Sequence, residues 1–208
     1  MLLTHMKDHV EELPQTINGK VIAISVVKGG AGKTASAVSI AAGLALHGMK
    51  YGWRVLLVDT DPQSTAANAL GKYTAVSQNK NLATLLDDDL YQMRPHEFIV
   101  PSSWNPQHLH YIPSSIKPME MMREKLNTKM GREHQLANIL EPLVSDYHFV
   151  IIDTGPANDI LTQNALVAAD QVIIPVNLDF LGLEAITRTI QMIKTIQVRL
   201  DKETPQIL

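Results

Sequence analysis

The 208-residue sequence contains no cysteine, which excludes disulfides, thiolate metal sites and iron–sulfur clusters held by cysteine. It has no apolar run that approaches the roughly 20 residues of a membrane-spanning helix. The N-terminus has no apolar signal-peptide core, because charged residues such as Lys7, Asp8 and Glu11 interrupt it. Positive charge is not in excess either, since the formal net charge is -3, which argues against a strongly basic nucleic-acid binder. We therefore expect a cytoplasmic protein with no integral membrane segment.

What the sequence does contain is a series of short runs rich in Val, Ile and Leu, each with the length of a strand. These runs are continuous rather than alternating, which is typical of parallel strands covered on both faces. Helical patterns separate them, and strands that alternate with helices indicate βαβ units. The sequence therefore predicts an α/β fold: a doubly wound, mainly parallel sheet with helices on both faces. The predicted strands cover residues 21–27, 55–58, 149–152 and 172–176, with a weaker candidate at 109–112, and the predicted helices cover residues 34–47, 136–143 and 183–200.

The strongest motif is a glycine-rich segment that follows the first predicted strand and opens a predicted helix. Glycines let backbone N–H groups surround a triphosphate without side-chain clashes, and the helix N-terminus adds its partial positive charge. Lys33 is then expected to reach the β- and γ-phosphates, and the Thr34 hydroxyl to coordinate Mg²⁺. This predicts a P-loop whose nucleotide-binding residues are Lys28, Gly29, Gly30, Ala31, Gly32, Lys33, Thr34 and Ala35.

This loop departs from the general P-loop pattern. Val27 occupies the position of the first glycine, and an additional lysine follows at Lys28. A second cation at the phosphates can act like an arginine finger, because it offsets charge that builds up during phosphoryl transfer. Lys28 and Lys33 are therefore both predicted to be catalytic.

Carboxylates follow two of the other predicted strands. The run at 55–58 leads to Asp59 and Asp61, and the run at 149–152 leads to Asp153. Side chains at the carboxyl edge of a parallel sheet lie where ligands bind. One carboxylate of the first pair can orient an attacking water and the other can hold Mg²⁺ through water, while Asp153 is expected near the same ion. An Asp-x-Asp-Pro turn alone is more often structural, so the prediction depends on all three motifs and on their order.

The domain organisation predicted from these patterns is simple. Residues 1–19 are polar and end in the turn pair Asn18–Gly19, which indicates an N-terminal extension outside the core. Residues 20–208 then form a single P-loop domain, which the family resemblance described below implies is an ATPase domain. Within it, residues 71–114 are less regular and rich in proline, so we expect short helices and long surface connections there.

The set of motifs resembles the ParA/MinD group of P-loop ATPases, and ParA-type partition proteins most closely. The similarity includes Tyr111–Ser114 and residues 136–147 and 164–176, and it extends from about Lys20 to the end of the chain. The resemblance implies ATP and Mg²⁺ as cofactors. The absence of an Asn-Lys-x-Asp guanine-reading motif agrees with adenine.

The resemblance also implies a mechanism. ATP is sandwiched in a homodimer, with Lys28 of each subunit reaching the phosphates held by the other. Asp61 positions the hydrolytic water, and Thr34, Asp59 and Asp153 hold or support Mg²⁺. The ATP-bound dimer binds DNA without sequence preference, and a ParB-type centromere-binding partner stimulates its slow ATPase activity. The expected protein is a nucleoid-associated dimerisation switch that partitions plasmid or chromosome DNA.

Several features depart from the family pattern. Ala35 stands where a second threonine is frequent, and the loop after Asp153 reads Thr-Gly-Pro-Ala rather than Thr-Pro-Pro. The sequence stops at Thr204–Leu208, where relatives begin another strand. We therefore expect a C-terminally truncated fragment or an unusually short member.

Alternative interpretations remain open at the level of sequence. One is a MinD-like, membrane-associated positioning ATPase that docks through a C-terminal amphipathic helix. Another is a metabolic synthetase of the same superfamily, whereas the absence of cysteine excludes a nitrogenase-type reductase. A further ambiguity concerns four basic residues, which form either a DNA-binding strip or a plain solvated helix face: Arg188, Lys194, Arg199 and Lys202.

Overall fold

A computed structural model gives the fold, and the residues it describes are 18–71, 80–87, 94–201, 203 and 205–208. Most of the predicted N-terminal extension therefore lies outside the described residues. The strands are β1 (Lys20–Ile24), β2 (Val55–Asp59), β3 (Val100–Pro101), β4 (Leu109–Ile112), β5 (Phe149–Asp153), β6 (Gln171–Ile173) and β7 (Gln206–Ile207). The α-helices are α1 (Lys33–Gly48), α2 (Thr65–Leu70), α3 (Leu82–Leu86), α4 (Ile116–Asn127), α5 (Gln135–Val144), α6 (Ile160–Ala168) and α7 (Phe180–Leu200). Short 3₁₀ turns are η1 (Met49–Tyr51), η4 (Pro95–Phe98) and η5 (Arg132–His134).

The strands of the described residues form one seven-stranded sheet in the order β3-β4-β2-β5-β1-β6-β7. Every neighbouring pair is parallel except β3 and β4, which are antiparallel. The order brings β1, β2 and β5 together at the centre, so the segments that follow these three strands meet at one edge. The register confirms this, because Asp59 on β2 is paired with Asp153 on β5.

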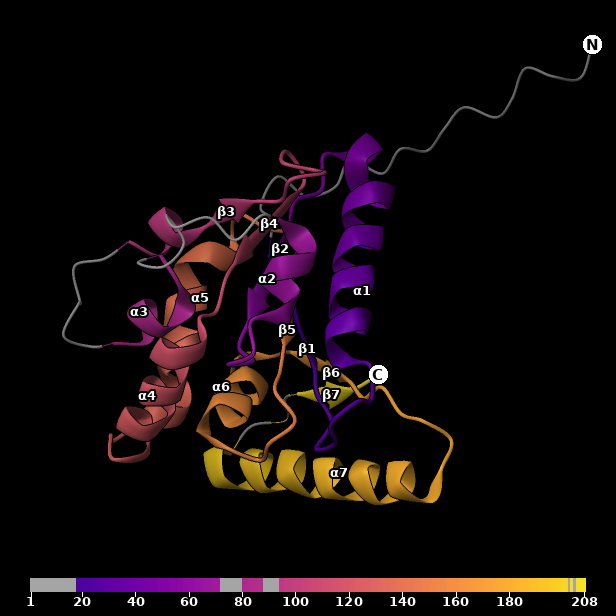
Figure 1. The fold of residues 1–208 in the computed structure, drawn as a ribbon, viewed down its shortest axis with the longest axis vertical. Coiled ribbons are helices and arrows are strands. Elements are labelled where there is room, and N and C mark those ends of the chain that lie inside the picture. The colour runs from indigo at the N-terminus through magenta and orange to yellow at the C-terminus, as the bar shows by residue number, and fades with distance from the viewer. Residues whose placement is uncertain (1–17, 72–79, 88–93, 202, 204) are drawn as a thin grey trace, which may run out of the picture.

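Helices cover both faces of the sheet (Figure 1). On one face, α1 and α2 pack small side chains such as Ala37 and Ala41 against Ile24 and Leu57. The other face carries α3 to α6, whose larger side chains pack on Ala23 and on residues of the other strands. Alternate residues of β1 point to opposite faces, as the pleat of a strand requires. The doubly wound, mainly parallel fold predicted from the sequence is confirmed.

The last long helix has a different position. α7 runs crosswise at the bottom of the view, near the loop that joins β1 to α1 (Figure 1). It packs on α6, and Ala185 contacts Val26 and Ala31 of that loop. The Val27 amide donates to Thr189 Oγ at 3.1 Å, so the loop is tied to this helix. Among the described residues, no helix combines the length and the apolar character that crossing a bilayer requires.

Two strand ends differ from the prediction. β1 stops at Ile24 rather than at Val27, because the chain leaves the sheet to form the glycine-rich loop. β6 stops at Ile173 rather than at residue 176, and Pro175, which has no N–H to donate to a ladder, follows soon afterwards. The helix predicted at 136–143 contains Pro142 in its last turn and ends just beyond it, at Val144. Hydrophobic runs predict which segments enter the sheet better than they predict where each strand stops.

Candidate nucleotide site

The glycine-rich loop lies between β1 and α1, where the sequence placed it. Gly30 and Gly32 have φ angles of 70° and 83°, a left-handed conformation that side chains rarely adopt. A Cβ atom added at either position would meet no heavy atom within 4 Å, so open space adjoins the loop. Gly32 caps α1, whose first turn carries no acidic residue, so the partial positive charge of the helix N-terminus is not offset there. Such a loop is suited to binding an anion.

The two lysines of the loop point to different partners. Lys33 is 6% exposed, and its Nζ donates to the Lys28 carbonyl at 2.8 Å. Burial lowers the pKa of Lys33, and the carboxylates of Asp153 and Asp61 partly oppose this effect. Lys28 instead contacts the start of α7, where its Nζ donates to both carboxylate oxygens of Asp179, at 2.9 and 3.1 Å.

Two buried carboxylates lie beside the loop, at the ends of neighbouring strands. Asp59 is fully buried and accepts from the backbone N–H groups of Asp61 and Ala67, at 3.1 and 3.3 Å. Burial and the adjacent Asp153 raise its pKa well above the usual value. Asp153 is also fully buried, and burial raises its pKa to about 6, although the Thr34 hydroxyl and Lys33 oppose the rise.

The third carboxylate, Asp61, lies in a loop that is held from several sides. Its Oδ1 accepts the Gln63 amide at 2.9 Å, and its carbonyl accepts the Ser114 hydroxyl at 2.6 Å. Ser114 in turn accepts, through its carbonyl, the hydroxyl of Ser64 at 2.9 Å. A Cβ added at Gly155 would lie 3.7 Å from the Asp61 carboxylate, so the loops after β2 and β5 are in contact. The structure therefore brings all three carboxylates to the edge of the sheet that carries the glycine-rich loop.

Comparisons with known proteins decide the family. A family model described as an AAA domain matches residues 19–205. The chain is 35% identical over 179 residues to the chromosome partitioning protein ParA of Myxococcus xanthus, and 34% identical over 186 residues to the sporulation initiation inhibitor protein Soj of Bacillus subtilis. These matches cover 85% and 89% of this chain, respectively. The chain belongs to the ParA/MinD family of P-loop ATPases.

This family member spans 59% of the length of the Myxococcus protein and 69% of the length of Soj. A solved structure that is similar to it is that of cobyrinic acid a,c-diamide synthase from Mycobacterium smegmatis, with a bound ATP analogue and magnesium. The TM-score is 0.77 at 28% identity, and the match covers 91% of this chain and 72% of the synthase. The resemblance read from the motifs is thus confirmed at the level of family and fold.

This ParA/MinD family member has side chains that are suitable ligands for a Mg²⁺ ion bound with the nucleotide. Within the described part of the chain, neither oxygen of Asp153 has a hydrogen-bond partner of standard geometry, although both oxygens are buried. The described residues contain no cluster of three or more His, Asp or Glu side chains that would hold a metal alone. Mg²⁺ in phosphate sites commonly takes one or two protein ligands and completes its shell with phosphates and water. Thr34 and Asp153 fit that pattern, whereas both oxygens of Asp59 already accept backbone N–H groups, which leaves Asp59 with fewer free acceptor sites than Asp153.

The buried carboxylate of Asp153 should cost stability while it is charged. Asp153→Asn is expected to raise the free energy of unfolding at pH 7.5 by about 1–3 kcal/mol, because the pKa of Asp153 is raised to about 6. When the pKa of a carboxyl group is higher in the folded state than in the unfolded state, the protonated form favours folding and the charged form opposes it. That contribution is complete below the unfolded-state pKa of about 3.9 and is lost as the pH rises through about 6. The gain from Asn should therefore shrink as the pH falls from 7.5 towards 4.

Urea unfolding in EDTA, without nucleotide, measures this difference. Asp146→Asn is the matched control, because it removes the same charge from a partly exposed position. We expect the control to change the free energy of unfolding by no more than about 0.5 kcal/mol. Destabilisation by Asp153→Asn at pH 7.5 would contradict the prediction.

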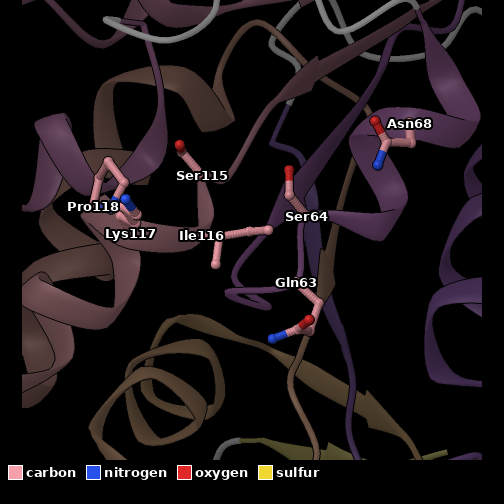
Figure 2. Close-up of a pocket in the computed structure, with 7 residues that line it drawn as sticks. All are labelled: Gln63, Ser64, Asn68, Ser115, Ile116, Lys117 and Pro118. Atoms are coloured by element: carbon pink, nitrogen blue, oxygen red, sulfur yellow. The ribbon is translucent and has the colours of Figure 1, made fainter.

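A cavity of about 650 Å³ opens next to the Asp61 loop, between α2 and the start of α4. In Figure 2, Gln63 and Ser64 lie on one side of it and Ser115 and Ile116 on the other. Its volume is within the roughly 300–1,000 Å³ of small-molecule sites. The lining residues are Gln63, Ser64, Asn68, Ser115, Ile116, Lys117 and Pro118.

Residues that sequence reasoning missed hold the loops rather than contact a ligand. Ser114 belongs to a segment that contributed to the family resemblance, but no role was predicted for it. Asp179 accepts from Gly182 as the N-cap of α7, and an acidic residue directly before a helical pattern was the available signal. Thr189, buried on α7, had no signal in the sequence, because its contact with Val27 depends on how the helix crosses the loop.

Proposed function

We propose that this chain is an ATPase that acts as an ATP-dependent dimerisation switch and partitions plasmid or chromosome DNA. The observation that carries the proposal is the presence of two lysines in one phosphate loop. Lys33 occupies the usual P-loop position, while the ammonium group of Lys28 is bound by Asp179 at the start of α7. A lysine in that position suits a role towards a second subunit. Myxococcus ParA, which is named for chromosome partitioning, supports the cellular role.

In the proposed reaction, residues 28–35 surround the phosphates of ATP, and Lys33 exchanges the Lys28 carbonyl for a phosphate oxygen. Bound Mg²⁺, held by Thr34 and Asp153, would offset negative charge on the β- and γ-phosphates. Asp61 orients the attacking water, since the Gln63 amide fixes its carboxylate. Lys28 of the second copy offsets the charge that develops during transfer.

The surface around Lys28 supports association of two copies. Residues after β6 and at the start of α7 expose large apolar side chains: Leu178, Phe180, Leu181 and Leu183. Leu178 is fully exposed and Phe180 is 75% exposed. Asp179, which binds Lys28, lies within the same segment. Clustered exposed apolar side chains mark interaction surfaces, and the continuity of this one with Lys28 favours a second copy of the chain.

The remaining partners of the proposed switch are DNA and a ParB-type activator. Arg188, Lys194 and Arg199 are exposed on α7, whereas Lys202 lies outside the described residues. Arg188 is 3.6 Å from Glu184, which weakens its case as a phosphate contact. DNA binding without sequence preference would come from such exposed cations.

The test measures binding of a random-sequence DNA duplex by fluorescence anisotropy, once in ATP-Mg²⁺ and once in ADP-Mg²⁺. We expect binding in ATP only, and weakening as salt increases. Lys33→Ala is the negative control: it should not bind the nucleotide, so it should not bind DNA in either ATP or ADP. Failure of the wild-type chain with both nucleotides would contradict DNA binding by this chain. Binding to anionic vesicles instead would favour the MinD-like alternative.

A second candidate function is an ATP-dependent synthetase. The likeness to cobyrinic acid a,c-diamide synthase and the cavity of about 650 Å³ beside the Asp61 loop favour it. A synthetase consumes ATP only when its small-molecule substrate is present, and it has no need of DNA. ATP-dependent DNA binding would therefore count against this candidate.

A further inference from the structure

The ion pair between Lys28 and Asp179 is the least expected contact of the site. Two hydrogen bonds, at 2.9 and 3.1 Å, join the ammonium group to both carboxylate oxygens. The Lys28 side chain is only 19% exposed, although the Asp179 side chain is 50% exposed. Charge-assisted bonds of this length are stronger than neutral ones, and partial burial of the cation limits screening by solvent. In the single chain, Lys28 is therefore held in place.

The carboxylate that holds Lys28 has a fixed position itself. Asp179 caps α7 by accepting the Gly182 amide, and its own amide donates to the Asn177 carbonyl at 2.8 Å. The turn is tight, since a Cβ added at Gly182 would lie 2.1 Å from the Asn177 carbonyl oxygen. Thr189 ties the residue before Lys28 to the same helix. α7 and its N-cap therefore hold the backbone of Val27 and the side chain of Lys28.

We propose that Asp179 is a positioning residue that holds Lys28 in the single chain, and that association of two copies on ATP must break this pair. The inference rests on the proposed function, in which Lys28 acts on the other subunit. Two of the three N–H donors of the Lys28 ammonium group are directed at Asp179, so the pair must open before the whole group can face a phosphate held by a second copy. Asp179 therefore competes with the partner-held nucleotide for Lys28, and the strength of this pair sets the protein concentration at which dimers form. Two such pairs break in each dimer, so weakening the pair changes the free energy of association by twice the effect on a single pair.

Asp179→Asn separates the ion pair from the cap. Asparagine is as good an N-cap as aspartate, so the Gly182 contact is retained while the charge is lost. With a non-hydrolysable ATP analogue, we expect the dimer dissociation constant of this variant to fall roughly 5- to 30-fold, because two weakened pairs contribute. Sedimentation equilibrium measures it. Affinity of the single chain for the analogue should stay unchanged, which a change in overall folding would not give.

Glu184→Gln provides a matched control, because it removes the same charge from α7 at an exposed residue paired with Arg188. We expect it to leave the dissociation constant within about twofold of the wild-type value. An equal or weaker dimer in Asp179→Asn, or an equal gain in the control, would overturn the inference.

A second measurement separates this inference from the proposed function. Acetylation of lysines by a water-soluble ester, read by mass spectrometry without nucleotide, reports whether Lys28 is held. We expect Lys28 to react several-fold faster in Asp179→Asn, with Lys20 as the internal reference. An unchanged rate would refute the hold on Lys28, whatever the dimer does. A faster rate in a protein that never dimerises with ATP would refute the proposed switch, and with it the claim that association breaks the pair.

Discussion

Lys33→Ala should weaken binding of ATP-Mg²⁺ by about 100-fold or more, because several charge-assisted contacts to phosphate are lost together. Lys33 begins α1, is 6% exposed, and lies near Asp153 and Asp61, which identifies its head group as the cation inside the phosphate site. No other lysine of the loop can replace it, since Lys28 is directed towards Asp179. Isothermal titration calorimetry with ATP-Mg²⁺ measures the loss.

Lys50→Ala is the control for this result. Lys50 lies beyond the far end of α1, where its ammonium group packs 4.6 Å from the ring centre of Tyr51. Its removal changes the net charge equally but should leave ATP affinity within about twofold. Since Lys33 also donates to the Lys28 carbonyl, thermal unfolding of both variants checks that the loop still folds. ATP binding by Lys33→Ala at wild-type strength would show that the glycine-rich loop is not the phosphate site.

Local chemistry explains why the centre of the site was predictable. A strand, a glycine-rich turn and a helix N-terminus are adjacent in the sequence, so their combination specifies an anion site without knowledge of the rest of the fold. The carboxylates required one further step, namely that parallel strands end at the same edge of a sheet. The register of Asp59 with Asp153 confirms that step. The roles assigned to the individual residues stay predictions.

The contacts that hold the glycine-rich loop and the Asp61 loop were not predictable, because they join residues that lie far apart in the sequence. Lys28 and Asp179 are separated by 151 positions, and Asp61 and Ser114 by 53. These pairs depend on how α7 crosses the β1–α1 loop and on which strand lies next to β2, and hydrophobic periodicity determines neither. The strand ends at Ile24 and Ile173 were missed similarly, because apolar residues beyond them, such as Val26 and Ile174, pack on α7 instead of continuing the strands.

The second large effect is expected from Lys28→Ala. Binding of ATP-Mg²⁺ by the single chain should change by no more than about threefold, since Lys28 contacts Asp179 rather than its own phosphate site. Dimerisation on a non-hydrolysable ATP analogue should weaken by about 100-fold or more, because each subunit would lose its charge-assisted contact with the nucleotide of the other. Calorimetry measures the first quantity and sedimentation equilibrium the second.

Lys20→Ala is the matched control for Lys28→Ala, because Lys20 also faces an aspartate, Asp170 at 3.9 Å, but lies at the other end of β1. It should dimerise like the wild-type chain, and an unchanged dimer in Lys28→Ala would refute the role assigned to Lys28.

Combining Lys28→Ala with Asp179→Asn tests the coupling of the two residues. If Asp179 acts only by holding Lys28, its replacement has nothing left to release in this background. The double variant should then dimerise no better than Lys28→Ala alone, whereas a gain in the double variant would show that Asp179 opposes association by another route.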